Sequence, residues 1–328
     1  MRMSAIFNVF RNALVVVLFS ITAGCVNLEE VQKFTEQSAA LSSSNEITGY
    51  LDKGAARRAK LEETNNSLLY SVNCDEYSSR QARIQKKKKS EITCPPLLTV
   101  PPFPAGLNED NKKSIASLHV VISDYMAKLA VLSGSDVVSL DKSTDELVSN
   151  LNKLPYTAES ASKEEKEKRN AAYGAMVKLI SIPLDLWRQH ELKRIIQEND
   201  ESIGTLANLL ASILRDQAGK IDSESKVVSN WYNLADSTFP ADTLEGALYV
   251  KNERDAKLAE ISSKKKAAEA YSEALLEIKN THHKLATESG SLDSDSGKQI
   301  IEYVKAAREK VVAARKQYDE AFKGESSK

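Results

Sequence analysis

Histidines are the side chains of this chain best suited to acid–base chemistry or metal binding, and their spacing favours neither role. His282 and His283 are adjacent, so on a helix they point about 100° apart and cannot hold one metal ion as residues four apart do. His119 and His190 are isolated, and the sequence has no HExxH motif, no paired Cys and His spacing and no Asp-rich calcium loop. We therefore predict no metal and no cofactor, and we expect the histidines at the surface or in seams between helices.

Motifs for covalent or phosphoryl chemistry are absent from the sequence as well. It contains no GxSxG, no Walker loop and no GxGxxG. Its many carboxylates lie on charged helical stretches, where Lys and Arg four residues away usually pair with them. The formal net charge of -1 provides no general attraction to nucleic acid. These features predict a protein that is not an enzyme, and a bundle enzyme without a sequence signature is the least favoured alternative.

The beginning of the sequence has the pattern of an export signal. Arg2 and Arg11 give a positive start and precede an apolar run, Ala13–Ile21, which is too short to span a bilayer because a spanning helix needs about 20 residues. The run ends in Thr22-Ala23-Gly24-Cys25, which resembles the lipobox of bacterial lipoproteins, although Thr22 stands where that motif usually has Leu, Val or Ile. The resemblance implies that residues 1–24 are a signal peptide and that Cys25 is acylated. The alternative is an ordinary signal peptide with a chance cysteine.

The resemblance also implies a location and a redox compartment. Val26, rather than Asp, after the acylated cysteine favours the outer membrane, with the protein facing the periplasm. Cys74 and Cys94 are then the two remaining cysteines, and in an oxidising envelope we expect them to form a disulfide. A metal pair or a redox-active pair is less favoured, because the sequence has no CxxC and no neighbouring His cluster.

A basic cluster lies between these two cysteines. It could contact anionic headgroups, lipopolysaccharide phosphates or an acidic partner, since each Lys or Arg near an anionic surface contributes about 1 kcal/mol. The alternative is a solvated helical face that Asp75, Glu76 and Glu91 partly neutralise. The cluster consists of Arg80, Arg83, Lys86, Lys87, Lys88 and Lys89.

The elements that must position these residues are expected to be helices. Gly and Pro are few, with 12 and 8 residues, and 28% of the chain is charged, which suits long solvated helices. Apolar residues recur at helical spacing over residues 47–72, 115–132, 162–218, 242–285 and 300–321. The spacing alternates regularly between three and four over 115–132 and 300–321, whereas the stripe over 47–72 is mixed. We predict an all-α, elongated bundle with antiparallel coiled-coil-like hairpins and no sheet. The last stripe is the most regular: Ile300, Val304, Ala307, Val311, Ala314, Tyr318 and Ala321.

Prolines and polar stretches divide this pattern. We expect a signal peptide over 1–24, an acylated N-terminus and tether over 25–45, a helical region with the basic loop over 46–160, and a long-helix region over 161–328. One helical segment around Val31 and Phe34 could pack on the body. Residues 93–107 are a proline-rich loop, and Pro183 is expected to kink its helix.

Together these features predict a membrane-anchored lipoprotein of the cell envelope that acts as a helical scaffold or interaction module. Its partners would be the membrane, through Cys25, and an unknown envelope protein, through helical seams. One alternative is a transport module that binds a lipid, glycan or peptide near Trp187 and Pro183 or near Trp231, although aromatic residues there more often fill a core. A surface-exposed lipoprotein for adhesion or phage exclusion is another.

Overall fold

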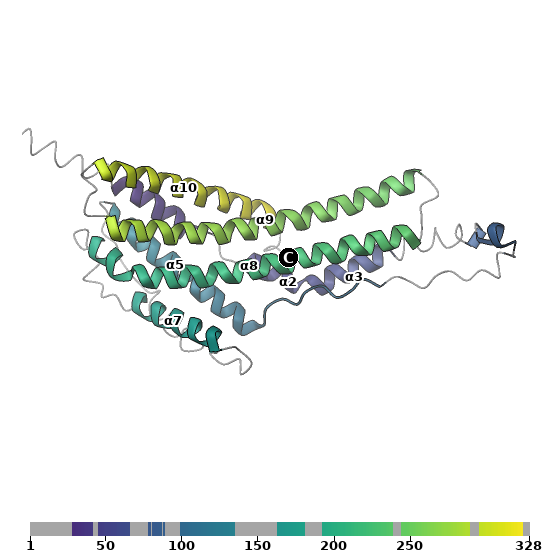
Figure 1. Ribbon diagram of the computed structural model, residues 1–328, viewed down its shortest axis with the longest axis horizontal. Helices are drawn as coiled ribbons and strands as arrows, with labels where there is room; N and C mark the ends of the chain where they lie inside the picture. Colours follow the sequence, from purple (N-terminus) through teal and green to yellow (C-terminus); the bar gives the residue numbers. More distant parts are fainter. Residues whose placement is uncertain are drawn as a thin grey trace, which may run out of the picture. The chain divides into compact units, whose positions relative to one another are not determined.

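A computed structural model gives the arrangement of the helices (Figure 1). It describes residues 28–41, 45–65, 78–79, 81–86, 88, 99–134, 163–180, 192–238, 244–288 and 295–323. Within these ranges the chain is almost entirely helical and has no strand, which confirms the prediction of an all-α bundle. The principal helices are residues 28–39, α2 (Asn45–Asp52), α3 (Gly54–Asn65), α5 (Glu109–Ser133), α7 (Lys163–Ile180), α8 (Leu192–Thr238), α9 (Leu244–Glu288) and α10 (Asp295–Phe322).

The described helices form two compact units, and each unit is assembled from separate stretches of the chain. Unit 1 takes its described residues from Met1–Ser44, Glu109–Ile213 and Ala270–Gln317. Unit 2 takes its described residues from Asn45–Asn108, Leu214–Glu269 and Tyr318–Lys328. The long helices α8, α9 and α10 therefore contribute residues to both units.

Helix α5 supplies much of the apolar core of unit 1. It follows the proline-rich stretch and ends at Ser133, where the Gly134 N–H donates to the carbonyls of Ala130 and Val131 at 3.1 Å each. Asn111–Ser133 is long and apolar enough to cross a membrane, but a core helix meets the same criteria. Its predicted stripe is buried within unit 1, as in a core helix: Ile115, Leu118, Ile122, Tyr125, Leu129 and Leu132.

In unit 1, α8 and α9 pack as an antiparallel pair. The Gln197 side chain donates to the Ala286 carbonyl at 3.1 Å, and further along the pair the Ser272 hydroxyl donates to the Ala211 carbonyl at 2.9 Å. The residue number rises on α8 as it falls on α9, which defines the antiparallel direction. The two long helices therefore form an antiparallel pair, as the sequence predicted in general for the long helices of the bundle.

Helix α10 packs against α9 in unit 1, and the apolar stripe of α10 is buried within the chain. Lys310 pairs with Glu277 at 3.0 Å, and the Lys284 ammonium lies 5.3 Å from the centre of the Tyr303 ring. Ile300, Val304, Ala307 and Val311, the first four stripe residues, have no exposed surface. The seam that could have served a partner's helix is thus occupied by the protein's own helices.

Unit 2 contains α2 and α3 where the sequence predicted one amphipathic helix over 47–72. The prediction of a single helix is wrong in its described part, because the helix breaks at Lys53, between Asp52 and Gly54. Gly54 is a weak helix former, and Gly106 packs against the backbone of Asp52 so closely that a Cβ would lie 3.2 Å from the Asp52 nitrogen. Residues 99–108 are not helical, as predicted for the described part of the loop.

Candidate functional site

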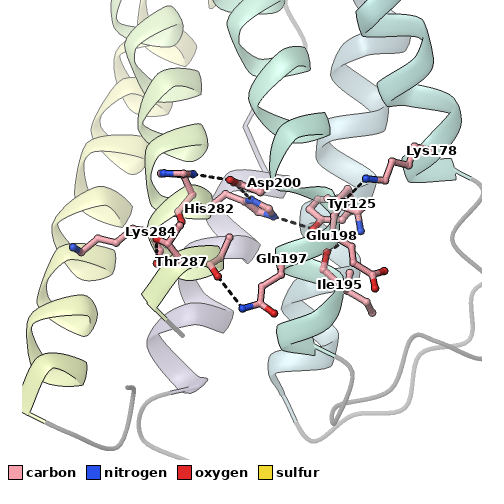
Figure 2. A network of polar contacts seen from close by, with 12 residues as sticks. Tyr125, Lys178, Ile195, Gln197, Glu198, Asp200, His282, Lys284 and Thr287 are labelled. Atoms are coloured by element: carbon pink, nitrogen blue, oxygen red, sulfur yellow. Dashed lines mark hydrogen bonds and ion pairs between the residues drawn. The ribbon is translucent and has the colours of Figure 1, made fainter. Parts of the chain in front are cut away.

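The most connected polar group in unit 1 surrounds His282 on α9. Its Nε2 lies 2.9 Å from the hydroxyl of Tyr125 on α5, and its Nδ1 lies 3.1 Å from Oδ1 of Asp200 on α8. Figure 2 shows the three side chains meeting between their helices. Tyr125 and His282 are buried, with 2% and 1% of their surface exposed. One imidazole therefore links three helices of the bundle.

The electrostatics of this Tyr–His–Asp group define its protonation state. Burial lowers the pKa of His282 and outweighs the opposing effect of Asp200, so the imidazole is neutral. The hydrogen bonds from His282 and then His283 lower the pKa of Asp200, and burial raises the pKa of Tyr125 well above its ordinary value. His282 Nδ1–H consequently donates to Asp200, and the Tyr125 hydroxyl donates to Nε2. The order of the hydrogen bonds resembles that of a catalytic triad, but here the hydrogen bonds join three different helices, α5, α9 and α8.

His283 binds the same carboxylate from the outside of the bundle. Its Nδ1 lies 2.6 Å from Oδ2 of Asp200, and 64% of its side chain is exposed. The side chain of His282 is buried and that of His283 is exposed, so the two adjacent imidazoles point in different directions, as the sequence predicted. Asp200 on α8 nevertheless binds both of them. Among the described residues, no group of three or more His, Cys, Asp or Glu side chains is placed to hold a metal ion.

A second buried imidazole, His119 on α5, joins two other parts of unit 1. Its Nε2 lies 3.0 Å from the carbonyl of Leu41, which can only accept, and the hydroxyl of Tyr271 on α9 lies 3.1 Å from Nδ1 and 3.2 Å from Nε2. Nε2–H therefore donates to the carbonyl, and Nδ1 accepts from the tyrosine. Burial lowers the pKa of His119 from 6.5 to about 4. This neutral histidine is again a link between helices.

The corresponding group in unit 2 is built around Glu224 on α8, which is only 2% exposed. Arg57 on α3 binds it with two nitrogens, Nη2 to Oε2 at 2.6 Å and Nε to Oε1 at 3.0 Å. The hydroxyl of Tyr50 on α2 donates to Oε1 at 3.0 Å, and burial raises the pKa of this tyrosine. The bidentate geometry is the strongest form of an Arg–carboxylate pair.

Lys264 on α9 extends this group toward α10. Its ammonium donates to the carbonyl of Ala321 at 3.0 Å and lies 4.9 Å from the Tyr50 ring centre and 5.1 Å from the Phe322 ring centre. The last carbonyls of a helix lack intrahelical partners and carry partial negative charge, so a buried cation there is favourable. Lys264 thus caps α10 and holds it in unit 2.

The residues that the sequence singled out are only partly described. Arg83, Lys86 and Lys88 of the basic cluster are exposed, and Lys86 has a positive φ of 52°. Trp231 and Tyr232 are buried, with ring centres 5.1 Å apart in an edge-on arrangement, as expected for residues that fill a core. Cys25, Cys74, Cys94, Arg80, Lys87, Lys89, Pro183, Trp187 and His190 lie outside the described residues.

The buried polar groups were missed at the sequence level, although a signal was available. His282 falls four residues after Ile278 and three before Leu285, both members of the apolar stripe of its helix. Glu224 occupies the same kind of position between Ile221 and Val228. A polar residue at a stripe position must be buried with a partner or must disrupt the stripe.

Comparisons of the chain with protein-family models, with curated proteins and with solved structures find no match.

Proposed function

We propose that the protein is a non-enzymatic interaction module of the bacterial cell envelope, anchored to a membrane through acylated Cys25. The Thr22–Cys25 motif behind an apolar leader supports the anchor. The observation that carries the interaction role is that the buried polar side chains form hydrogen bonds between helices. His119, His282 and Glu224 are buried, and each connects helices through its hydrogen bonds.

We expect partner binding to use the outer faces of the helices, since the α10 stripe from Ile300 to Tyr318 is buried within the chain. In unit 2, three exposed apolar side chains lie near the connection between α8 and α9. Leu234 is four residues from the end of α8, and Leu248 and Tyr249 are in the second turn of α9; their exposed fractions are 50%, 47% and 52%. Exposed apolar side chains of this size are candidates for contact with a partner.

The anchor is tested by replacing Cys25 with Ala in the producing bacterium. We expect the wild-type chain to incorporate a labelled fatty acid and to fractionate with membranes. The C25A chain should lose the label and become extractable without detergent. A C25A chain that stays in the membrane fraction would contradict the proposed anchor, and a Cys74→Ala variant serves as the control for loss of a cysteine.

The interaction role is tested by crosslinking in intact cells from a photoreactive residue at Leu248, at Tyr249 or at Lys88 in the basic cluster. One dominant envelope protein as the adduct would support the proposal. Adducts with lipid or glycan alone would overturn it in favour of a ligand-binding module. A photoreactive residue at the buried position Val304 is the matched control and should give only crosslinks within the chain.

A further inference from the structure

The helix of residues 28–39 is a part of unit 1, although it begins directly after the acylation motif. Its inward side chains are packed into the unit: Val31 is 2% exposed and Phe34 is 1% exposed. Thr35 and Ser38 are buried as well, and their hydroxyls donate to carbonyls of the preceding turn. A stretch with four buried side chains in twelve residues is docked, and it cannot act as a flexible spacer.

Polar contacts fix both ends of this helix. Near its start, Arg308 of α10 pairs with Glu30 at 2.6 Å, and both side chains are about four-fifths buried, with 21% and 20% exposed. At its end, the Ala39 carbonyl accepts from the Ser123 hydroxyl, and the Leu41 carbonyl accepts from His119 at 3.0 Å. The last carbonyls of a helix have no partners within the helix itself, so these contacts from α5 cap the helix from the side.

The same contacts give the direction of the helix. Its end lies beside Ser123 of α5, and Gln32 near its start lies against Gly134, where a Cβ would be 3.0 Å from the Gln32 Nε2. The helix is therefore antiparallel to α5, and it begins at the end of unit 1 where α5 ends. Along α5, His119 contacts Tyr271 of α9 and the later Tyr125 contacts His282, so α5 and α9 run in the same direction and end at the same end of unit 1. The contact between Gln197 and Ala286 places the start of α8 beside the end of α9.

Only Val26 and Asn27 separate Cys25 from Leu28, the first residue of the docked helix. Three residue steps span at most about 11 Å. We infer that, in the acylated protein, this end of unit 1 lies against the headgroups of the lipid leaflet that holds the acyl chains. The inference rests on the proposed anchor and adds to it a defined membrane-facing surface, formed by the start of helix 28–39, the start of α8 and the end of α9. Unit 1 is therefore held at the membrane surface by a short connection and is not separated from the membrane by a flexible linker.

The test uses the full acylated chain, purified in detergent and reconstituted in phosphatidylcholine vesicles that contain a lipid with a nitroxide on its headgroup. A fluorescent amino acid is placed at Lys193, at the start of α8, or at Ser212, and both positions are exposed in unit 1. The two sites are separated by about 28 Å along the helix. We expect quenching at residue 193 to be at least threefold stronger than at residue 212. Equal quenching at the two sites in a fully acylated chain would overturn the inference.

Two further measurements separate the possible causes. Intact mass is recorded before reconstitution, and a chain without acyl mass would overturn the proposed anchor and this inference with it. A variant with 20 Gly and Ser residues inserted between Asn27 and Leu28 lengthens the connection by about 25 Å on average. Its quenching at residue 193 should fall to the level of residue 212. Unchanged quenching in this variant would show that the surface binds lipid by itself and would overturn the short connection as its cause.

Discussion

His119 makes unit 1 sensitive to acid, and replacing it tests how the bundle is held together. The neutral imidazole joins Leu41 to Tyr271, and a proton on it would place a charge where only 6% of the residue is exposed. In His119→Gln the amide N–H can still donate to the Leu41 carbonyl and the amide oxygen can still accept from Tyr271. The variant removes the titration while keeping the geometry.

The magnitude follows from the pKa of His119, which burial lowers from 6.5 to about 4. The unfolded chain binds the proton more readily than the folded chain, so folding stability is complete above pH 6.5 and is lost as the pH falls toward 4. A difference of this size costs about 3 kcal/mol by pH 4, because one pKa unit corresponds to about 1.4 kcal/mol. His282 contributes in the same direction, since burial lowers its pKa as well.

The assay is urea unfolding of wild type and His119→Gln from pH 7 to pH 4, followed by circular dichroism and by hydrogen exchange of peptides from α5. Carboxylates contribute equally to both proteins, so the difference between the two free energies of unfolding isolates His119. We expect wild type to lose about 3 kcal/mol relative to the variant over this range. His283→Asn, an exposed control that can still donate to Asp200, should follow wild type. Parallel pH profiles for wild type and His119→Gln would refute the reasoning.

Three further substitutions test the packing, each by its effect on the free energy of unfolding in urea. Glu224→Leu should cost about 3 kcal/mol by leaving Arg57 without its carboxylate, and adding Arg57→Met to it should recover much of that loss; a double variant that recovers nothing would contradict a coupled pair. Gly106→Ala should cost about 1–3 kcal/mol, because a Cβ would press on the backbone of α2, and an unchanged midpoint would show that this contact yields freely. Val304→Ala should cost about 2 kcal/mol, whereas Val312→Ala, on the exposed face of α10, should stay within about 0.5 kcal/mol; equal effects would place the seam wrongly.

The regular stripes were the part of the fold that could be predicted from the sequence. The alternating spacing of Ile300, Val304, Ala307 and Val311 predicted a helix with one buried face, and these side chains are fully buried. The end of α5 at Ser133-Gly134 was predictable for a similar reason, since Gly commonly follows the last helical turn. Local periodicity and local stop signals were sufficient for these elements.

Long-range pairing could not be predicted in the same way. The stripe of α10 does not specify whether it packs within the chain or on a partner, because any complementary apolar face would satisfy it. The partners of His282 and Glu224 lie 82 and 167 residues away, at Asp200 and Arg57, and nothing in the local sequence identifies them. A division of the chain at consecutive boundaries also could not give two units that are each built from distant stretches.

The contacts between distant residues also set an order of folding. Glu30 is joined to Arg308 across 278 positions, and Glu46 is joined to Tyr318 across 272. Neither unit can complete its core until α10 has been synthesised. Until then the helices near the start of the chain lack their packing partners on α10. Such distant contacts slow folding and lengthen the time during which apolar faces are exposed. Folding of either unit is therefore completed only after nearly the whole chain has been made.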